Sequence, residues 1–173
     1  MTIRKILTEP DPLLRQKSLD INIVNNETRK LMDDMLDTMY AAPGIGLAAI
    51  QVGIPKRIIV IDLSKEEEKK PLYFINPKII LKSKNNATYE EGCLSVPGQF
   101  AEIDRPDQCH IHYLDYNGKK QELKAEGLLA TCIQHEMDHL EGILFIDYLS
   151  KLKKSFIVKK LSKNKKSLER IVV

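Results

Sequence analysis

Gln134-His135-Glu136-Met137-Asp138-His139 is the stretch around which we expect this chain to fold, because it places a His-Glu-x-x-His pattern on one helix. Residues four apart on a helix lie one above the other, so the imidazoles of His135 and His139 can converge on one cation. Glu136 lies beside them, where its carboxylate can take a proton from a water molecule that the cation binds. A chance match on a polar helix face is the alternative. The stretch therefore predicts a central helix that carries a metal-dependent hydrolytic site.

The sequence around this helix predicts one α+β domain in residues 1–150, with antiparallel sheets surrounding the motif helix. Helices are expected at about 27–41, 126–140 and 150–163, the second of them ending near Gly142. The first carries an apolar stripe that we interpret as core, formed by Leu31, Met32, Met35, Leu36 and Met39. Strands are expected at about 57–62, 73–81 (interrupted by Pro77), 99–104, 108–115 and 119–124, the last two joined by the tight turn of Asn117-Gly118.

A catalytic metal site normally has three protein ligands and one position for water, so a third ligand is required. After His139 the chain has no further histidine, and Asp147 and Glu169 are poorly spaced candidates. More candidates lie upstream or on the motif helix itself, and the residues alone leave the choice open. They are Cys93, Cys109, His110, His112 and Cys132.

Two of these candidates have a distinctive setting. Cys132 falls on the same helix face as the two motif histidines, although a small buried cysteine would have the same spacing. Cys93 lies in a glycine-flanked turn, Glu91-Gly92-Cys93-Leu94-Ser95-Val96-Pro97, where backbone can approach a ligand closely. His110 and His112 alternate with other residues of a predicted strand and are expected on its more polar face.

Three segments resemble the signature motifs of peptide deformylase and follow one another in that family's order. They are Gly44-Ile45-Gly46-Leu47-Ala48-Ala49-Ile50-Gln51, Glu91-Gly92-Cys93-Leu94-Ser95 and Gln134-His135-Glu136-x-x-His139. The resemblance runs from the start at Ile6 through Phe145, hence over nearly the whole chain. It implies removal of the N-formyl group from the initiator methionine of nascent polypeptides, with release of formate. It also favours Cys93 as the third ligand, beside His135 and His139, of one divalent ion. By resemblance this ion is Fe²⁺, and Zn²⁺, Ni²⁺ or Co²⁺ can take its place.

The same resemblance implies roles for residues that do not bind the metal. Glu136 would move the protons, while the Gln51 side-chain amide and the Leu94 backbone N–H would donate hydrogen bonds to the formyl oxygen. Phe100 departs from the family, because some members carry a basic residue at this place near the substrate, and this calls a polar clamp on the peptide into question. The expected binding site for the methionine and the peptide backbone consists of Ile45, Gly46, Tyr89, Gly92, Leu128, Thr131 and Cys132.

Composition fits such an enzyme without identifying it. A chain of 173 residues with 43% hydrophobic and 29% charged residues is ordinary for a soluble domain, and no apolar run is long enough to span a bilayer. The N-terminus lacks the apolar core of a signal peptide, so we expect a protein of the bacterial cytoplasm. We also expect a monomer. Three cysteines, an odd number, argue against a disulfide framework and suit a reducing compartment.

Positive charge is concentrated in residues 151–173, which we treat as a basic helix and tail appended to the domain. They carry nine Lys or Arg and one acid, whereas residues 1–150 have a net charge of −5. The predicted helix has an apolar side formed by Leu152, Phe156, Ile157 and Leu161. By its resemblance to the C-terminal helix of similar deformylases, this helix is expected to contact the ribosome near the polypeptide exit. A solvated helix is the alternative.

Two other functions compete with deformylation. A small His-Glu-x-x-His metallopeptidase would use the same metal centre, but it would take its third ligand from downstream of the motif. A non-enzymatic, metal-stabilised RNA- or ribosome-binding module would explain the basic tail. It would have a closed four-ligand site, whereas Glu136 and Gln51 indicate an open one.

Overall fold

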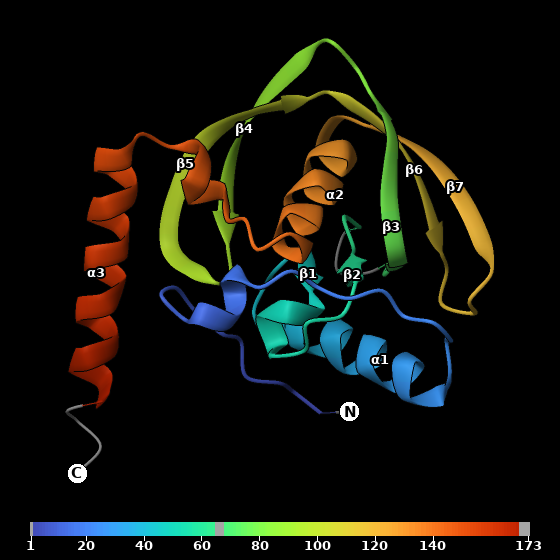
Figure 1. Cartoon of the computed structure of the whole chain (residues 1–173), viewed down its shortest axis with the longest axis horizontal. Coiled ribbons are helices and arrows are strands. Elements are labelled where there is room, and N and C mark those ends of the chain that lie inside the picture. Colours follow the sequence, from blue (N-terminus) through green and yellow to red (C-terminus); the bar gives the residue numbers. More distant parts are fainter. Residues whose placement is uncertain (1, 65–67, 170–173) are drawn as a thin grey trace.

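Helix α2, which carries the His-Glu-x-x-His motif, stands at the centre of the fold (Figure 1). The structure, a computed structural model, describes residues 2–64 and 68–169, the last six of them as backbone only. The helices are α1 (Asn26–Ala41), α2 (Gly127–Leu140) and α3 (Lys151–Glu169), with 3₁₀ turns at Pro12–Arg15, Ala49–Val52 and Phe145–Tyr148. The strands are β1 (Gly46–Ala48), β2 (Ile58–Ile61), β3 (Leu72–Lys82), β4 (Asn86–Cys93), β5 (Val96–Pro106), β6 (Gln108–Leu114) and β7 (Lys120–Glu126).

Two antiparallel sheets surround α2, as predicted. The larger has the strand order β1-β2-β3-β6-β7, and the smaller is the hairpin of β4 and β5. Apolar side chains of the larger sheet, among them Ile59, Phe74 and Ile111, pack against Ala130 and Ile133 of α2 in one buried cluster. In Figure 1 the β4–β5 hairpin lies on the other side of α2, so the motif helix is enclosed from both sides. The predicted α+β class is confirmed.

Helix α1 covers the opposite face of the larger sheet over β1 and β2. The Asn25 side chain caps it by accepting a hydrogen bond from the Thr28 backbone N–H at 2.9 Å. Four members of its predicted apolar stripe are fully or almost fully buried, namely Leu31, Met32, Met35 and Met39. The stripe is therefore core, as predicted.

Helix α2 ends where a left-handed glycine turns the chain. Gly142 has φ 74°, and the next residue, Ile143, donates its backbone N–H back to the carbonyl of Asp138 at 2.9 Å. A side chain at Gly142 would also collide with the backbone of Arg15, whose carbonyl carbon would lie 2.7 Å from the added Cβ. Only glycine fits this position, and it joins the end of the motif helix to the N-terminal segment.

Three parts of the strand prediction were wrong. The short strand β1 was not predicted, because its three residues lie within a glycine-rich segment. Strand β4 was not predicted, because its apolar alternation is short: Ala87 and Tyr89 occupy inward positions, but the next inward position holds the charged Glu91. Pro77 does not interrupt β3. The register against β6 shifts between Ile75 and Lys78, and Asn76 absorbs the irregularity with φ 50°, a conformation that asparagine tolerates.

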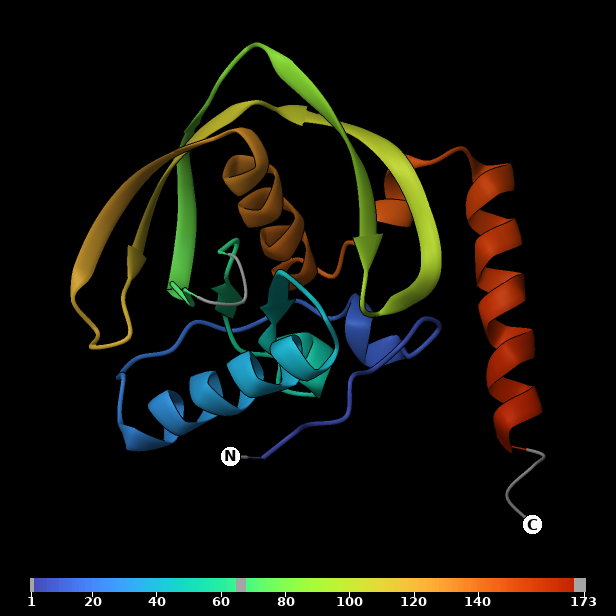
Figure 2. The same ribbon diagram turned by 180° about the vertical axis from the view of Figure 1, so that it is seen from behind.

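Helix α3 runs along the outside of β5, as both views of the chain show (Figures 1 and 2). It continues to Glu169, beyond the predicted end near residue 163, and residues 170–173 lie outside the described residues. Its predicted apolar side is divided. Leu161 is 5% exposed and packs with Val96 and Phe145, whereas Leu152 and Phe156 are 83% and 73% exposed. Among the described residues, no helix combines the length and apolar character that a membrane crossing requires.

Candidate active site

Three side chains that can bind a metal meet between α2 and the β4–β5 hairpin. His135 and His139 come from the buried face of α2, and Cys93 is the last residue of β4. Their ligand atoms all lie within 4.8 Å of one another, and the Cys93 Sγ is 3.3 Å from the His139 Nε2. A thiol and two imidazoles within this distance form a donor set that suits Fe²⁺, Zn²⁺, Ni²⁺ or Co²⁺.

The other candidates for the third ligand lie elsewhere or outside this group. Cys109 is buried among apolar residues of the core, where burial raises its pKa. Cys132 lies on α2 close to the site, but it does not belong to the group of ligand atoms that lie within 4.8 Å of one another. Burial also raises the pKa of its thiol to about 12. Asp147 binds Arg15 at 2.6 Å and Lys154 at 2.5 Å instead. The Glu169 side chain is outside the described residues.

The remaining two candidates, His110 and His112, lie on the outer face of β6. They form a separate group with Glu122. Both are more exposed than the alternating residues of the same strand, as expected for its polar face.

A buried carboxylate orients the ring of His135. Its Nδ1 is 2.8 Å from an oxygen of Glu91, which leaves Nε2 directed toward the other two ligand candidates. Arg105 donates two hydrogen bonds to the same carboxylate and a third to Asp138 at 2.8 Å. Burial opposes the charge of Glu91, but the bonds from His135 and Arg105 outweigh it and lower the pKa of this carboxyl.

Sequence reasoning missed this group, although Glu91 stands within the quoted Glu-Gly-Cys-Leu-Ser segment. A glutamate two residues before Cys93 gives no sign that it reaches a histidine 44 residues further on. The only available signal was that a metal-binding histidine usually donates its second ring N–H to a carboxylate or carbonyl.

The protonation of the second histidine also fits a metal ligand. Burial disfavours a charged imidazole and lowers the pKa of His139 well below its usual range, so this side chain is neutral. Its Nδ1 is buried without a hydrogen-bond partner among the described residues, which leaves Nε2, near the Cys93 Sγ, as the atom that faces the other donors. The residues present therefore fit a divalent metal ion.

Glu136 lies beside this group with a free carboxylate oxygen. The side chain is 5% exposed, and its Oε2 has no hydrogen-bond partner among the described residues. Burial raises its pKa to about 7, which is suited to a group that accepts and returns a proton near neutral pH. The carboxylate packs against Gly46 of β1, where no side chain intervenes.

The Gln51 amide has a fixed orientation. Its Oε1 accepts a hydrogen bond from the Ala48 backbone N–H at 2.8 Å, so the Nε2 end must be the donor that faces the site. Nε2 donates to the Ser95 hydroxyl at 3.0 Å and lies 3.5 Å from the Cys93 Sγ. Leu94 follows Cys93 in the turn between β4 and β5. A polar donor is thus held next to the metal candidates.

A cavity of about 470 Å³ opens onto these groups. Phe100, 66% exposed, lies at its rim, with its ring packed across Gly92. Both Gly46 and Gly92 belong to strands that pair on one side only, because β1 is an edge of the larger sheet and the smaller sheet has two strands. The lining of the cavity includes Gln51, Cys93, Leu94, His135 and Glu136. It also includes every residue expected to bind substrate, namely Ile45, Gly46, Tyr89, Gly92, Leu128, Thr131 and Cys132.

An α+β fold in which a buried His-Glu-x-x-His helix meets a cysteine thiol, with a buried glutamate lining the adjoining cavity, defines a metal-dependent hydrolase. Comparison with known proteins narrows this class. The family described as polypeptide deformylase matches residues 3–155, and the chain belongs to this family.

Relatives from sequence and structure agree. The peptide deformylase of Pelagibacter ubique (strain HTCC1062) is 70% identical over 176 residues, which cover 100% of both chains. The peptide deformylase of Maricaulis maris (strain MCS10) is 60% identical over 171 residues, with 98% of each chain covered. The crystal structure of peptide deformylase from Ehrlichia chaffeensis in complex with actinonin superposes with a TM-score of 0.91 at 46% identity, covering 95% of this chain and 98% of that one.

The family fixes the activity. Its members are metalloenzymes that remove the N-formyl group from nascent chains, and this bacterial-type chain is a peptide deformylase. The metallopeptidase and the non-enzymatic binding module that the sequence left as alternatives are not supported.

Proposed function

We propose that Cys93, His135 and His139 hold one divalent metal ion, and that Glu136 carries the protons during hydrolysis of the formyl amide. The observation that supports this most is the buried carboxylate of Glu136, which has a free oxygen beside three metal-binding side chains. A cation held by these residues supplies Lewis acidity, which makes a water molecule easier to deprotonate and the formyl carbonyl easier to attack.

Glu136 is proposed to act first as base and then as acid. It takes a proton from the water whose oxygen forms a bond to the formyl carbon, and it returns that proton to the methionine nitrogen as the carbon–nitrogen bond breaks. The products are formate and a peptide with a free amino terminus. A pKa near 7 matches both roles, because such a carboxyl gains and loses a proton with similar ease at neutral pH.

Gln51 and Leu94 are proposed to stabilise the charge that develops on the formyl oxygen. The Gln51 Nε2 is a defined donor next to Cys93, because its amide oxygen is already bonded to the Ala48 backbone. The Leu94 backbone N–H would be the second donor, from the turn that follows Cys93. A donor of this kind contributes about 3 kcal/mol to lowering the activation barrier.

The substrate is proposed to bind as an extended strand between β1 and β4. Both strands have an unpaired edge, and their glycines, Gly46 and Gly92, let a peptide backbone come close. The methionine side chain would enter the adjoining part of the cavity, whose mixed apolar lining suits a flexible thioether. That part consists of Ile45, Tyr89, Leu128, Thr131 and Cys132.

Glu136→Gln separates proton transfer from metal binding. Glutamine keeps the size of the side chain but cannot accept the proton, so we expect formate release from a formyl-Met peptide to be lost while the metal content stays normal. Metal analysis and formate measurement on the same purified sample test this. Near-normal turnover in the variant would refute the role of Glu136.

We further propose that Fe²⁺ is the native ion, as the resemblance to the family implies. A thiolate and two imidazoles accept it, and because ordinary affinity trends do not favour Fe²⁺, availability and geometry would decide. Anaerobic reconstitution of separate samples with Fe²⁺, Zn²⁺, Ni²⁺ and Co²⁺ tests it, with turnover per bound ion as the measurement. A monomer in the bacterial cytoplasm is also proposed, since the substrates are nascent chains and the curated relatives named above are bacterial proteins. Size-exclusion chromatography tests the monomer.

Helix α3 is proposed to contact the ribosome near the polypeptide exit, as the basic helix of similar deformylases implies. Several of its lysines are exposed, whereas Leu161 and Ile157 hold the helix to the domain. Removing the whole helix would therefore disturb the core, and changing charges alone is the sharper test. Binding through lysines to phosphate weakens steeply as salt rises.

The test variant changes three exposed lysines of α3 to glutamine, Lys159, Lys160 and Lys163. The matched control changes three exposed lysines outside α3, Lys56, Lys84 and Lys119. We expect the first variant to lose co-sedimentation with ribosomes while it still acts on a free formyl-Met tripeptide, and the control to keep both. Equal sedimentation of all three proteins, or binding that is the same at low and high salt, would leave α3 as a solvated helix.

A further inference from the structure

The face of the larger sheet that points away from α2 carries a second group of metal-binding side chains. Cys109 and Ile111 of β6 are buried in the core cluster that includes α2, so the alternating residues His110 and His112 project from the opposite face. Glu122 of β7 stands directly opposite His112 in the strand register and diagonal to His110. None of these three residues belongs to the hydrolytic site.

The distances within this group fit a shared ion better than hydrogen bonds. The Glu122 Oε2 is 3.5 Å from the His112 Nε2 and 3.6 Å from the His110 Nε2, and all three ligand atoms lie within 4.8 Å of one another. An N–H···O hydrogen bond spans about 2.7–3.2 Å, which is shorter. Ligand atoms about 2.0–2.1 Å from a tetrahedral ion are separated by about 3.3 Å, close to the spacing observed.

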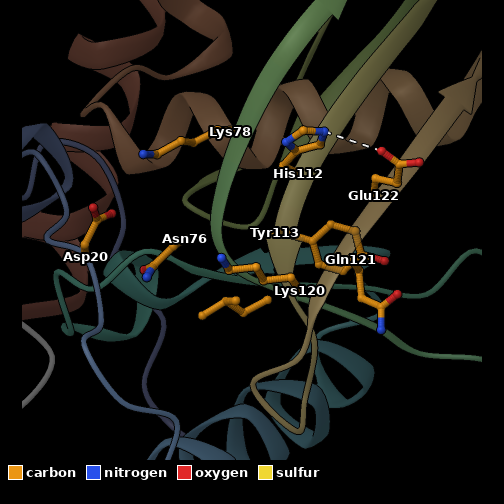
Figure 3. Close-up of a pocket in the computed structure, with 9 residues that line it drawn as sticks. Asp20, Asn76, Lys78, His112, Tyr113, Lys120, Gln121 and Glu122 are labelled. Carbon is orange, nitrogen blue, oxygen red and sulfur yellow. Dashed lines mark ion pairs between the residues drawn. The ribbon is translucent and has the colours of Figure 1, made fainter.

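One atom of the group lacks any other partner. The Nε2 of His110 is buried without a hydrogen bond among the described residues, although buried polar atoms are normally paired. The other two side chains are open to solvent, His112 by 53% and Glu122 by 71%. Figure 3 shows His112 and Glu122 facing each other at the edge of an open cavity of about 670 Å³, so an ion can reach them and water can complete its coordination.

We propose that His110, His112 and Glu122 bind one divalent transition-metal ion of the zinc or copper kind on the outer face of β6 and β7. Two imidazoles and one carboxylate suit Zn²⁺, Cu²⁺ or Ni²⁺, whereas Mg²⁺ and Ca²⁺ prefer oxygen ligands alone. The ion joins two neighbouring strands and so stabilises their hairpin. Lys78 and Lys124 stand opposite His112 and His110 in the register, and their positive charges make this site weaker than the thiol-containing one.

The number of zinc ions bound per chain tests the site. Because both sites are filled with the same metal, movement of ions between them does not change the count. Samples are freed of metal, dialysed to equilibrium against excess Zn²⁺ and analysed for zinc per chain. We expect two ions in the natural chain and one in the His110→Asn/His112→Asn variant. Lys124→Gln is the matched control on the same face, and it should keep both ions and bind the second no more weakly.

Thermal unfolding gives a second readout that does not depend on activity. An ion that binds only the folded chain raises the unfolding temperature as its concentration rises. Both proteins are first loaded with metal at the hydrolytic site. We then expect added Zn²⁺ to raise the unfolding temperature of the natural chain but not that of the double variant. The turnover of the double variant should equal that of the natural chain. His112→Asn alone, at a half-exposed position, gives the same comparison should the double variant not fold. A single zinc in the natural chain, or equal counts in the natural chain and the histidine variants, would overturn the proposal and leave only polar contacts between the two strands.

Discussion

Replacing Gly46 with alanine tests whether the position of the Glu136 carboxylate controls the rate. A methyl group added at Gly46 would lie 2.9 Å from the Glu136 Cδ and 3.0 Å from its Cγ. Carbon atoms in ordinary contact are about 3.5–4.0 Å apart. Because the backbone of Gly46 is outside the left-handed region, alanine does not meet the strain of a positive φ there. The collision with Glu136 acts on kcat, whereas obstruction of the peptide backbone would act on KM.

The structure sets the size of the effect. Glu136 has to retreat by about 0.5–1 Å, the difference between these separations. It is 5% exposed on a packed helix, so it cannot turn into solvent. A displacement of about 1 Å at a reacting group costs on the order of 10²-fold in rate, or about 2.7 kcal/mol in activation free energy. We therefore expect Gly46→Ala to lower kcat about 100-fold with an unchanged metal content.

Formate release from a formyl-Met tripeptide measures this, with metal analysis of the same sample. Gly44→Ala, two residues before Gly46, is the matched control. Its added methyl meets the end of the half-buried Leu94 side chain, which can turn away, so turnover should stay within a few-fold. An unchanged KM is expected if the alanine acts through the carboxylate and not by blocking the peptide. Near-normal turnover of Gly46→Ala, or a loss that lies only in KM, would refute the reasoning.

Three further predictions concern the ligands, the donor and the C-terminal helix. Cys93→Ala should lose both metal and activity, whereas Cys132→Ala should keep the metal and lose little more than packing; metal analysis that gives the reverse would exchange their roles. Gln51→Leu should lower turnover by on the order of 10²–10³ with the metal retained, and a loss under ten-fold in steady-state kinetics would count against a donor role. Leu161→Ala should cost about 2 kcal/mol of unfolding free energy, because it empties a buried site. Phe156→Ala, at an exposed position of the same helix, should change that free energy by less than about 0.5 kcal/mol. Denaturant unfolding at equal metal content compares the two, and similar losses would contradict the packing described for α3.

The elements that sequence predicted well are those whose apolar residues recur at the helical period. The stripe of α1 from Leu31 to Met39 and the motif helix ending before Gly142 are local patterns, so the chain itself displays them. Strand β4 has no sustained apolar pattern, since its inward positions from Tyr89 onward face the cavity and not the core. Its existence depends on pairing with β5, which a local pattern does not encode.

The residues of the candidate site could be predicted where they belong to one local sequence motif. They could not be predicted where residues remote in the sequence meet only in the folded structure. His135 and His139 are related by helix geometry, but the residues alone left Cys93 among five candidates for the third ligand. The role of Glu91 could not be predicted, because its partner histidine is remote in the chain. Helix α3 shows the same limit: its apolar residues were assigned to one face, yet the structure buries Leu161 and exposes Phe156.

The wide separation of the proposed ligands along the chain has a consequence for biosynthesis. The β4–β5 hairpin with Cys93 is translated well before the helix with His135 and His139. While the chain is being made, this thiol has neither imidazole beside it, and it is available to oxidants and to any thiol-seeking ion nearby. A deformylase that serves growing chains thus has its own vulnerable period as a growing chain, which ends only when α2 has left the ribosome and packed against the hairpin.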